Sequence, residues 1–81
     1  MSEYQIGQAA SRVGLSPDTL RYYEKIGLLR KVFRNSAGRR IYIDKDISRL
    51  TFVKRAQRMN FTLAEIAQLL EMRENPQGAR E

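Results

Sequence analysis

The chain has 81 residues, the size of one small domain rather than two. It contains no Cys and no His, which excludes a disulfide framework, a thiolate metal site and the enzyme chemistries that need those side chains within this stretch. Its 15 Lys and Arg residues outnumber its 9 Asp and Glu residues, and no apolar run approaches the ~20 residues that cross a bilayer.

The excess positive charge is concentrated in the middle of the chain. Residues 30–40 hold five basic residues and no acidic one, whereas residues 1–29 hold three of each. A solvated surface would spread its charge more evenly, so the central stretch favours a polyanion site, with nucleic acid as the first candidate. Ordinary basic surface stays open as an alternative, as does an interaction module that docks an acidic protein.

Two short helices are predicted first. One is expected over residues 7–13, where apolar residues recur at helical spacing, and ends at Gly14. The other is expected over residues 17–26, because Ser16 is a good N-cap, Pro17 suits the first helical position and a glycine follows its end. Two helices joined by such a tight turn form a helix-turn-helix.

A β-hairpin, or wing, is predicted next. A turn cluster at residues 35–38 separates two short extended arms. In the second arm Ile41 and Ile43 alternate with Arg40 and Tyr42. We therefore expect the two isoleucines on an apolar face, with Arg40 and Tyr42 on a polar, positively charged one.

Two longer helices are predicted after the hairpin. The first is expected over residues 45–59 with Asp44 as its cap, and the second begins at a capping box formed by Thr62 and Glu65. The turn cluster at residues 75–78 is expected to end it. The residues expected to line the buried faces of these helices are Leu50, Val53, Ala56, Leu63, Ile66, Ala67 and Leu70.

The predicted fold is therefore mainly α with a small β-hairpin, a winged helix-turn-helix of four helices. We expect the domain to span residues 1–75, with residues 76–81 as a tail or as the start of a missing dimerisation segment. No Gly-rich phosphate loop, paired buried carboxylates or metal-ligand cluster is visible, so an enzyme is not expected.

The second helix presents a polar side that suits a DNA groove. With Leu20 turned into the core, Arg21, Tyr22 and Lys25 lie on the open side of the helix and Tyr23 lies nearer the core. A short exposed helix fits the major groove, where Arg21 can reach a guanine edge or a phosphate. Lys25 is equally well explained as solvated surface.

A resemblance to the DNA-binding domain of the MerR family lies in three segments, TLRYYEKIGLL (19–29), GRRIYIDKDISRLTFVKRAQRMNF (38–61) and TLAEIAQLL (62–70). It covers residues 4 to about 74, and its third segment looks most like the metal-responsive branch. Asn60 stands where the family usually has glycine, and asparagine tolerates the left-handed backbone that this turn requires.

The resemblance implies DNA contacts from three elements. Arg21 and Tyr22 would meet base edges and backbone, while Arg40 and Tyr42 of the wing and Lys54 of the third helix would meet phosphates. We expect the basic residues among them to face the same way. The full set of expected DNA-binding residues is Ser16, Thr19, Arg21, Tyr22, Arg39, Arg40, Tyr42, Lys54 and Arg58. Two alternatives stay open, namely Arg39 as ordinary solvated charge and Tyr42 as a residue that packs under the wing.

The resemblance also implies partners and a mode of action. The expected partner is double-stranded promoter DNA, bound by a homodimer of the longer form that represses transcription and, with its effector, activates it by distorting the promoter. RNA polymerase would be reached only indirectly, and the location would be the cytoplasm, at the bacterial nucleoid. No cofactor is expected in this chain, and a metal ion or small-molecule effector would bind in a missing C-terminal segment. An excisionase-like architectural protein that bends DNA stays open as an alternative.

Overall fold

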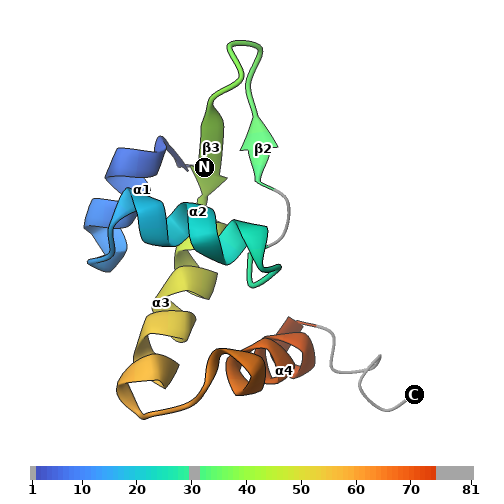
Figure 1. Cartoon of the computed structure of the whole chain (residues 1–81). Helices are drawn as coiled ribbons and strands as arrows, with labels where there is room; N and C mark the ends of the chain where they lie inside the picture. The colour runs from blue at the N-terminus through green and yellow to red at the C-terminus, as the bar shows by residue number, and fades with distance from the viewer. Residues whose placement is uncertain (1, 30–31, 75–81) are drawn as a thin grey trace.

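Four helices and a small sheet make up the part of the chain that the structure, a computed structural model, describes, namely residues 2–29 and 32–74 (Figure 1). In chain order the elements are β1 (Glu3–Tyr4), α1 (Ile6–Val13), α2 (Pro17–Lys25), β2 (Phe33–Arg34), β3 (Arg40–Ile43), α3 (Asp44–Arg58) and α4 (Leu63–Glu74). The predicted winged helix-turn-helix is confirmed. The expected helix end at residues 75–78, the domain boundary and the tail lie outside the described residues.

The helix-turn-helix forms through local signals. Gly14 ends α1 in the left-handed conformation, with φ of 75°. The Ser16 hydroxyl oxygen then accepts a hydrogen bond from the Thr19 N–H at 3.1 Å and caps α2. The first helix starts at Ile6, one residue earlier than predicted, because the Gln8 side chain accepts the Gln5 N–H at 2.9 Å.

The sheet has one strand more than predicted. Its order is β1-β3-β2, with both pairs antiparallel. In the hairpin Phe33 pairs with Ile41 and Arg34 pairs with Arg40. The extra strand, β1, pairs Tyr4 with Tyr42. Two residues are too few to show an alternating pattern, so this strand depends on a partner about 40 positions away.

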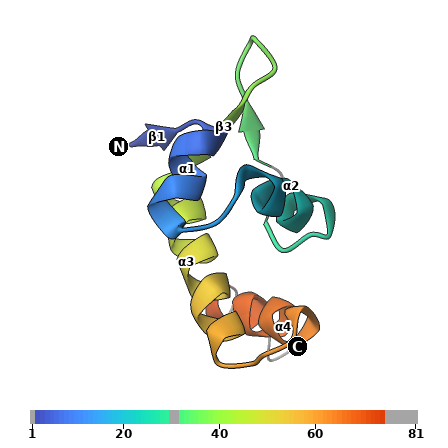
Figure 2. The same ribbon diagram turned by 60° about the vertical axis from the view of Figure 1, so that its left-hand side comes forward.

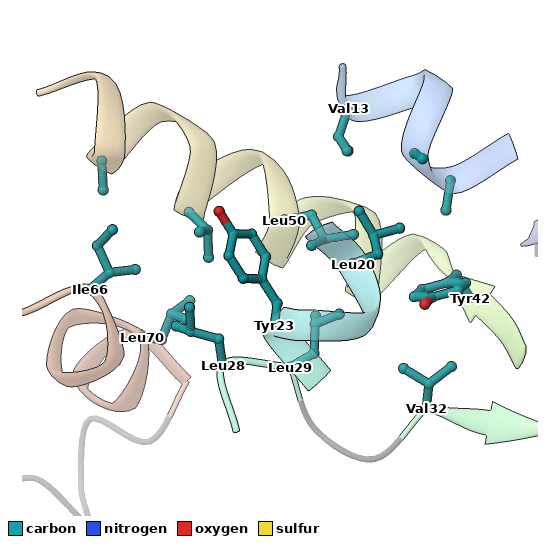
Figure 3. Packing of buried hydrophobic residues seen from close by; sticks show 14 residues of the cluster. Val13, Leu20, Tyr23, Leu28, Leu29, Val32, Tyr42, Leu50, Ile66 and Leu70 are labelled. Carbon is teal, nitrogen blue, oxygen red and sulfur yellow. The ribbon is translucent and has the colours of Figure 1, made fainter. Parts of the chain in front are cut away.

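The predicted facing of β3 is wrong. Tyr42 is fully buried, whereas Ile43 is 36% exposed and Ile41 is half-buried. Figure 3 shows the Tyr42 ring beside Leu20 and Val32, inside the core. A tyrosine ring buries a large apolar area, so the helices pack over Tyr42 and leave the isoleucines on the outer face of the sheet.

The third helix connects the two ends of the molecule (Figures 1 and 2). It starts at Asp44 rather than Lys45, and its capping group is the Asp46 carboxylate, which accepts the Ile43 N–H at 3.0 Å. Asp44, the predicted cap, instead accepts the Tyr4 hydroxyl at 2.9 Å. The left-handed conformation expected at Asn60 is confirmed, with φ of 70°.

The fourth helix begins as predicted. The Thr62 N–H donates to Glu65 Oε1 at 2.8 Å, and the Glu65 N–H donates to Thr62 Oγ1 at 3.1 Å, which completes the capping box. Ile66 and Leu70 are buried and Leu63 is half-buried, but Ala67 is exposed, so its predicted place in the core is wrong.

One hydrophobic core joins the sheet, the helix-turn-helix and the last two helices. Its fully buried side chains lie on α1, α2, β3, α3 and α4, and the buried residues Leu28, Leu29 and Val32 come from the segment between α2 and β2 (Figure 3). The buried positions among the described residues hold no charged side chain. The largest of the fully buried side chains are Tyr42, Leu20, Leu50, Ile66, Leu70 and Val53.

Candidate nucleic-acid interface

The outer face of α2 carries the side chains that were predicted to be open. Arg21 and Lys25 are exposed, and Tyr22 is 51% exposed. Tyr23, one position on, is buried and donates its hydroxyl to Gln57 Oε1 at 2.6 Å. Burial, together with the neighbouring Tyr22, raises the pKa of the Tyr23 hydroxyl. Tyr23 therefore fixes α2 to α3, while the opposite face of α2 stays accessible.

Arg21 is only loosely held. Its Nη1 lies 2.7 Å from Asp18 Oδ1, but the two side chains are 48% and 92% exposed. Such exposed pairs contribute little to stability, so the guanidinium can exchange this carboxylate for another acceptor. Ser16 and Thr19, also predicted to touch DNA, sit at the start of the helix and bond to each other through their hydroxyl oxygens at 2.8 Å.

Four arginines from two elements line one concavity between the helices and the hairpin. Its volume is about 270 Å³, and its lining residues are Gln5, Ile6, Arg21, Arg34, Gly38, Arg39 and Arg40. Arg21 comes from α2, whereas the other three arginines come from the hairpin. The structure therefore brings Arg21, Arg39 and Arg40 together as expected, in a hollow that favours an anion.

Arg34 was not among the predicted site residues. It pairs with Arg40 across the hairpin, and its Nη1 donates to the Gly38 carbonyl at 3.1 Å. The signal that could have found it is the hairpin register, because residues paired across two strands point to the same face. The turn cluster alone left that register open.

Glu24 was also missed, and it ties α2 to the hairpin. Its Oε1 accepts from Arg40 Nε at 2.6 Å, and its Oε2 accepts from the Val32 N–H at 3.4 Å. Burial by itself would raise the pKa of the Glu24 carboxyl, but the hydrogen bonds from Arg40 and Val32 outweigh it and the pKa is lowered. No local pattern marks Glu24, because Arg40 lies 16 positions further along the chain.

Tyr42 lies in the core and not on the surface of the hairpin. Its side chain is fully buried, and its hydroxyl has no hydrogen-bond partner in the described part of the chain. Burial raises the pKa of this hydroxyl, and the Arg40 charge offsets only part of the rise. Tyr42 therefore packs in the core beside Leu20 and Val32 (Figure 3), and its contact with a phosphate stays a prediction.

Lys54 is directed at the protein itself. Its Nζ donates to the Val13 carbonyl at 3.0 Å and to the Gly14 carbonyl at 3.3 Å, where the end of α1 leaves carbonyl groups unpaired. It is not among the residues that line the arginine concavity. The concavity thus joins Arg21 and Arg40, whereas Lys54 bonds to the end of α1 and its contact with a phosphate stays a prediction. Arg58, in the last turn of α3, is exposed and also lies outside the concavity.

Over residues 2–29 and 32–74, no group of three or more His, Cys, Asp or Glu side chains is placed to hold a metal ion. No helix in the same two ranges is both long enough and apolar enough to cross a membrane.

Comparison with known proteins gives a consistent assignment. Residues 4–73 match the MerR HTH family of regulatory proteins. The regulator ZntR of Escherichia coli K12 is 38% identical over 74 residues, which is 91% of this chain and 52% of that protein. The mercuric resistance operon regulatory protein of Bacillus cereus is 41% identical over 68 residues, which is 84% of this chain and 52% of that protein.

The solved structures agree. HiNmlR, a MerR family regulator lacking the sensor domain and bound to promoter DNA, superposes with a TM-score of 0.80 at 34% identity, over 86% of this chain and 53% of that one. The chain spans about half the length of the curated relatives it matches. The family match, the curated relatives and the shared winged helix-turn-helix together mean that this chain belongs to the MerR HTH family of regulatory proteins.

Proposed function

We propose that the chain binds double-stranded promoter DNA as the DNA-binding part of a transcription regulator. In this proposal α2 enters the major groove and the hairpin lies against the adjacent backbone. The observation that carries it is the single concavity shared by Arg21 of α2 and by Arg34, Arg39 and Arg40 of the hairpin. HiNmlR, which shares the fold, is bound to promoter DNA, and this supports the same role here.

The two elements would divide the work. Tyr22 and Arg21 on the open face of α2 are the candidates for reading base edges, since the major groove admits a helix and displays a distinct pattern for each base pair. The hairpin arginines are the candidates for phosphate contacts, which set affinity and position. With about four phosphates neutralised, the slope of log affinity against log salt would be roughly −3.6.

We extend the proposal to the longer protein. A homodimer would join two copies and raise their effective concentration on one DNA site, which a weakly binding single copy needs. A relative named as a mercuric resistance operon regulatory protein favours a metal ion as effector, and RNA polymerase would be affected through the promoter. The match over residues 4–73 favours such a regulator over the excisionase-like alternative.

The test is selection of duplexes from a randomised library by the 81-residue chain, followed by salt titration of the selected duplex. We expect a sequence preference and a steep loss of affinity between about 50 and 200 mM salt. Equal binding to every duplex would overturn the base-reading role. Absence of binding to any duplex at low salt, with retained binding to an acidic polypeptide, would favour the interaction-module alternative.

A further inference from the structure

We propose that Glu24 is a positioning residue for DNA binding, which holds Arg40 and the hairpin at a set distance from α2. The inference rests on the proposed function and names a residue through which that site is assembled. Glu24 itself would touch no nucleotide.

The geometry places Glu24 between the two DNA-facing elements. It lies near the end of α2, and its two carboxylate oxygens take different partners: the Arg40 Nε at the start of β3 and the Val32 N–H just before β2. One side chain of the groove-binding helix therefore holds both arms of the hairpin. The Glu24 side chain is only 15% exposed, so water competes little for its hydrogen bonds.

The ion pair leaves Arg40 able to bind an anion. Arginine has five N–H donors, and Glu24 engages the single donor on Nε. Arg40 still lines the concavity with Arg21, Arg34 and Arg39, and its side chain is 23% exposed. Glu24 thus holds Arg40 through Nε, and the two terminal nitrogens of the guanidinium remain available to a phosphate.

A positioning role and a simple charge effect predict opposite results. A carboxylate near a phosphate site repels DNA, so its removal would tighten binding if charge alone mattered. If Glu24 positions Arg40, the same removal weakens binding because the order of the hairpin is lost. The sign of the change in affinity therefore separates the two.

The experiment measures the affinity of the 81-residue chain for the library-selected duplex at low salt, comparing Glu24→Gln with Glu71→Gln. Glu71 is an exposed residue of α4, so its substitution changes the net charge equally. We expect Glu24→Gln to weaken binding about tenfold, in the range of coupling within one hydrogen-bonded network. Glu71→Gln should leave binding unchanged or slightly tighter.

A double-mutant comparison tests whether Glu24 acts through Arg40. In an Arg40→Gln background, Glu24→Gln should cause no further loss. Thermal unfolding of each variant shows whether it folds. If Glu24→Gln does not fold, Glu24→Asp replaces it, because this change keeps the charge but shortens the side chain. Glu24→Asp should also weaken binding.

Two results would overturn the inference: a Glu24→Gln chain that binds as tightly as Glu71→Gln, or a loss that persists undiminished beside Arg40→Gln. Failure of the wild-type chain to bind any duplex would instead overturn the proposed function, so the two failures are distinguishable.

Discussion

The half of the molecule built from α2 and the hairpin uses its basic residues differently from the half built from α3 and α4. In the first half, Arg21, Arg34 and Arg39 line an open hollow with Arg40. In the second half, Lys54 donates to two carbonyls at the end of α1. The difference shows that the acceptors of the fold around a basic side chain, and not its charge alone, decide how far it stays open to an external anion: Lys54 Nζ bonds to two helix-end carbonyls, whereas Arg34 bonds to one carbonyl and still lines the hollow.

The largest effect should come from the face of α2. Arg21→Ala is expected to cost about 1–3 kcal/mol of binding free energy and to relax base preference at one position of the duplex. Lys25→Ala, which removes the same charge from the same helix, should weaken all duplexes equally. Competition between duplexes that differ at single positions measures both. An equal loss for all duplexes with Arg21→Ala would make Arg21 a phosphate contact only.

Substitutions of Lys54 and Arg34 compare a basic residue of the second half with one of the first. Lys54→Met should lower the free energy of unfolding by about 1 kcal/mol, because two helix-end carbonyls lose a charged donor, and should leave the salt slope unchanged. Arg34→Met should leave the unfolding midpoint nearly unchanged and reduce the salt slope by about one unit. Urea unfolding and salt titration of both variants provide the measurements. A slope reduced in Lys54→Met would restore the phosphate contact that the family resemblance implies.

The Glu24–Arg40 ion pair predicts that the stability of the chain depends on pH. Because the pKa of Glu24 is lowered from its ordinary value of 4.5, the pair's contribution to stability is present above pH 4.5 and is lost as the pH falls toward the lower pKa of the folded state. Urea midpoints measured between neutral pH and acid should show this loss for the wild-type chain. The Glu24→Gln chain should show less of it, and equal curves would contradict the assignment.

The smallest effect is expected at Tyr42. Tyr42→Phe removes a buried hydroxyl that has no hydrogen-bond partner in the described residues, so stability should stay the same or rise by up to about 1 kcal/mol. DNA affinity should not change. A clear loss of affinity with an unchanged unfolding midpoint would show that the hydroxyl reaches a phosphate after all.

Much of the fold could be predicted because its signals are short-range. The Ser16 cap, the stop at Gly14 and the capping box of Thr62 and Glu65 each involve groups within four positions of one another. Which side chains of β3 face the core could not be predicted, because an alternating pattern defines two faces of a strand without showing which one the helices cover. The aromatic area of Tyr42 decided that choice against the isoleucines.

The candidate site divides in the same way. By itself the sequence determined the helix-turn-helix, the basic hairpin and the open face of α2, since helix periodicity and turn residues act through the local backbone. Only the tertiary structure decided that Glu24 meets Arg40, that Lys54 turns to the end of α1 and that Tyr4 pairs beside Tyr42. These contacts join groups 16 to 41 positions apart, and their formation depends on how the whole core packs.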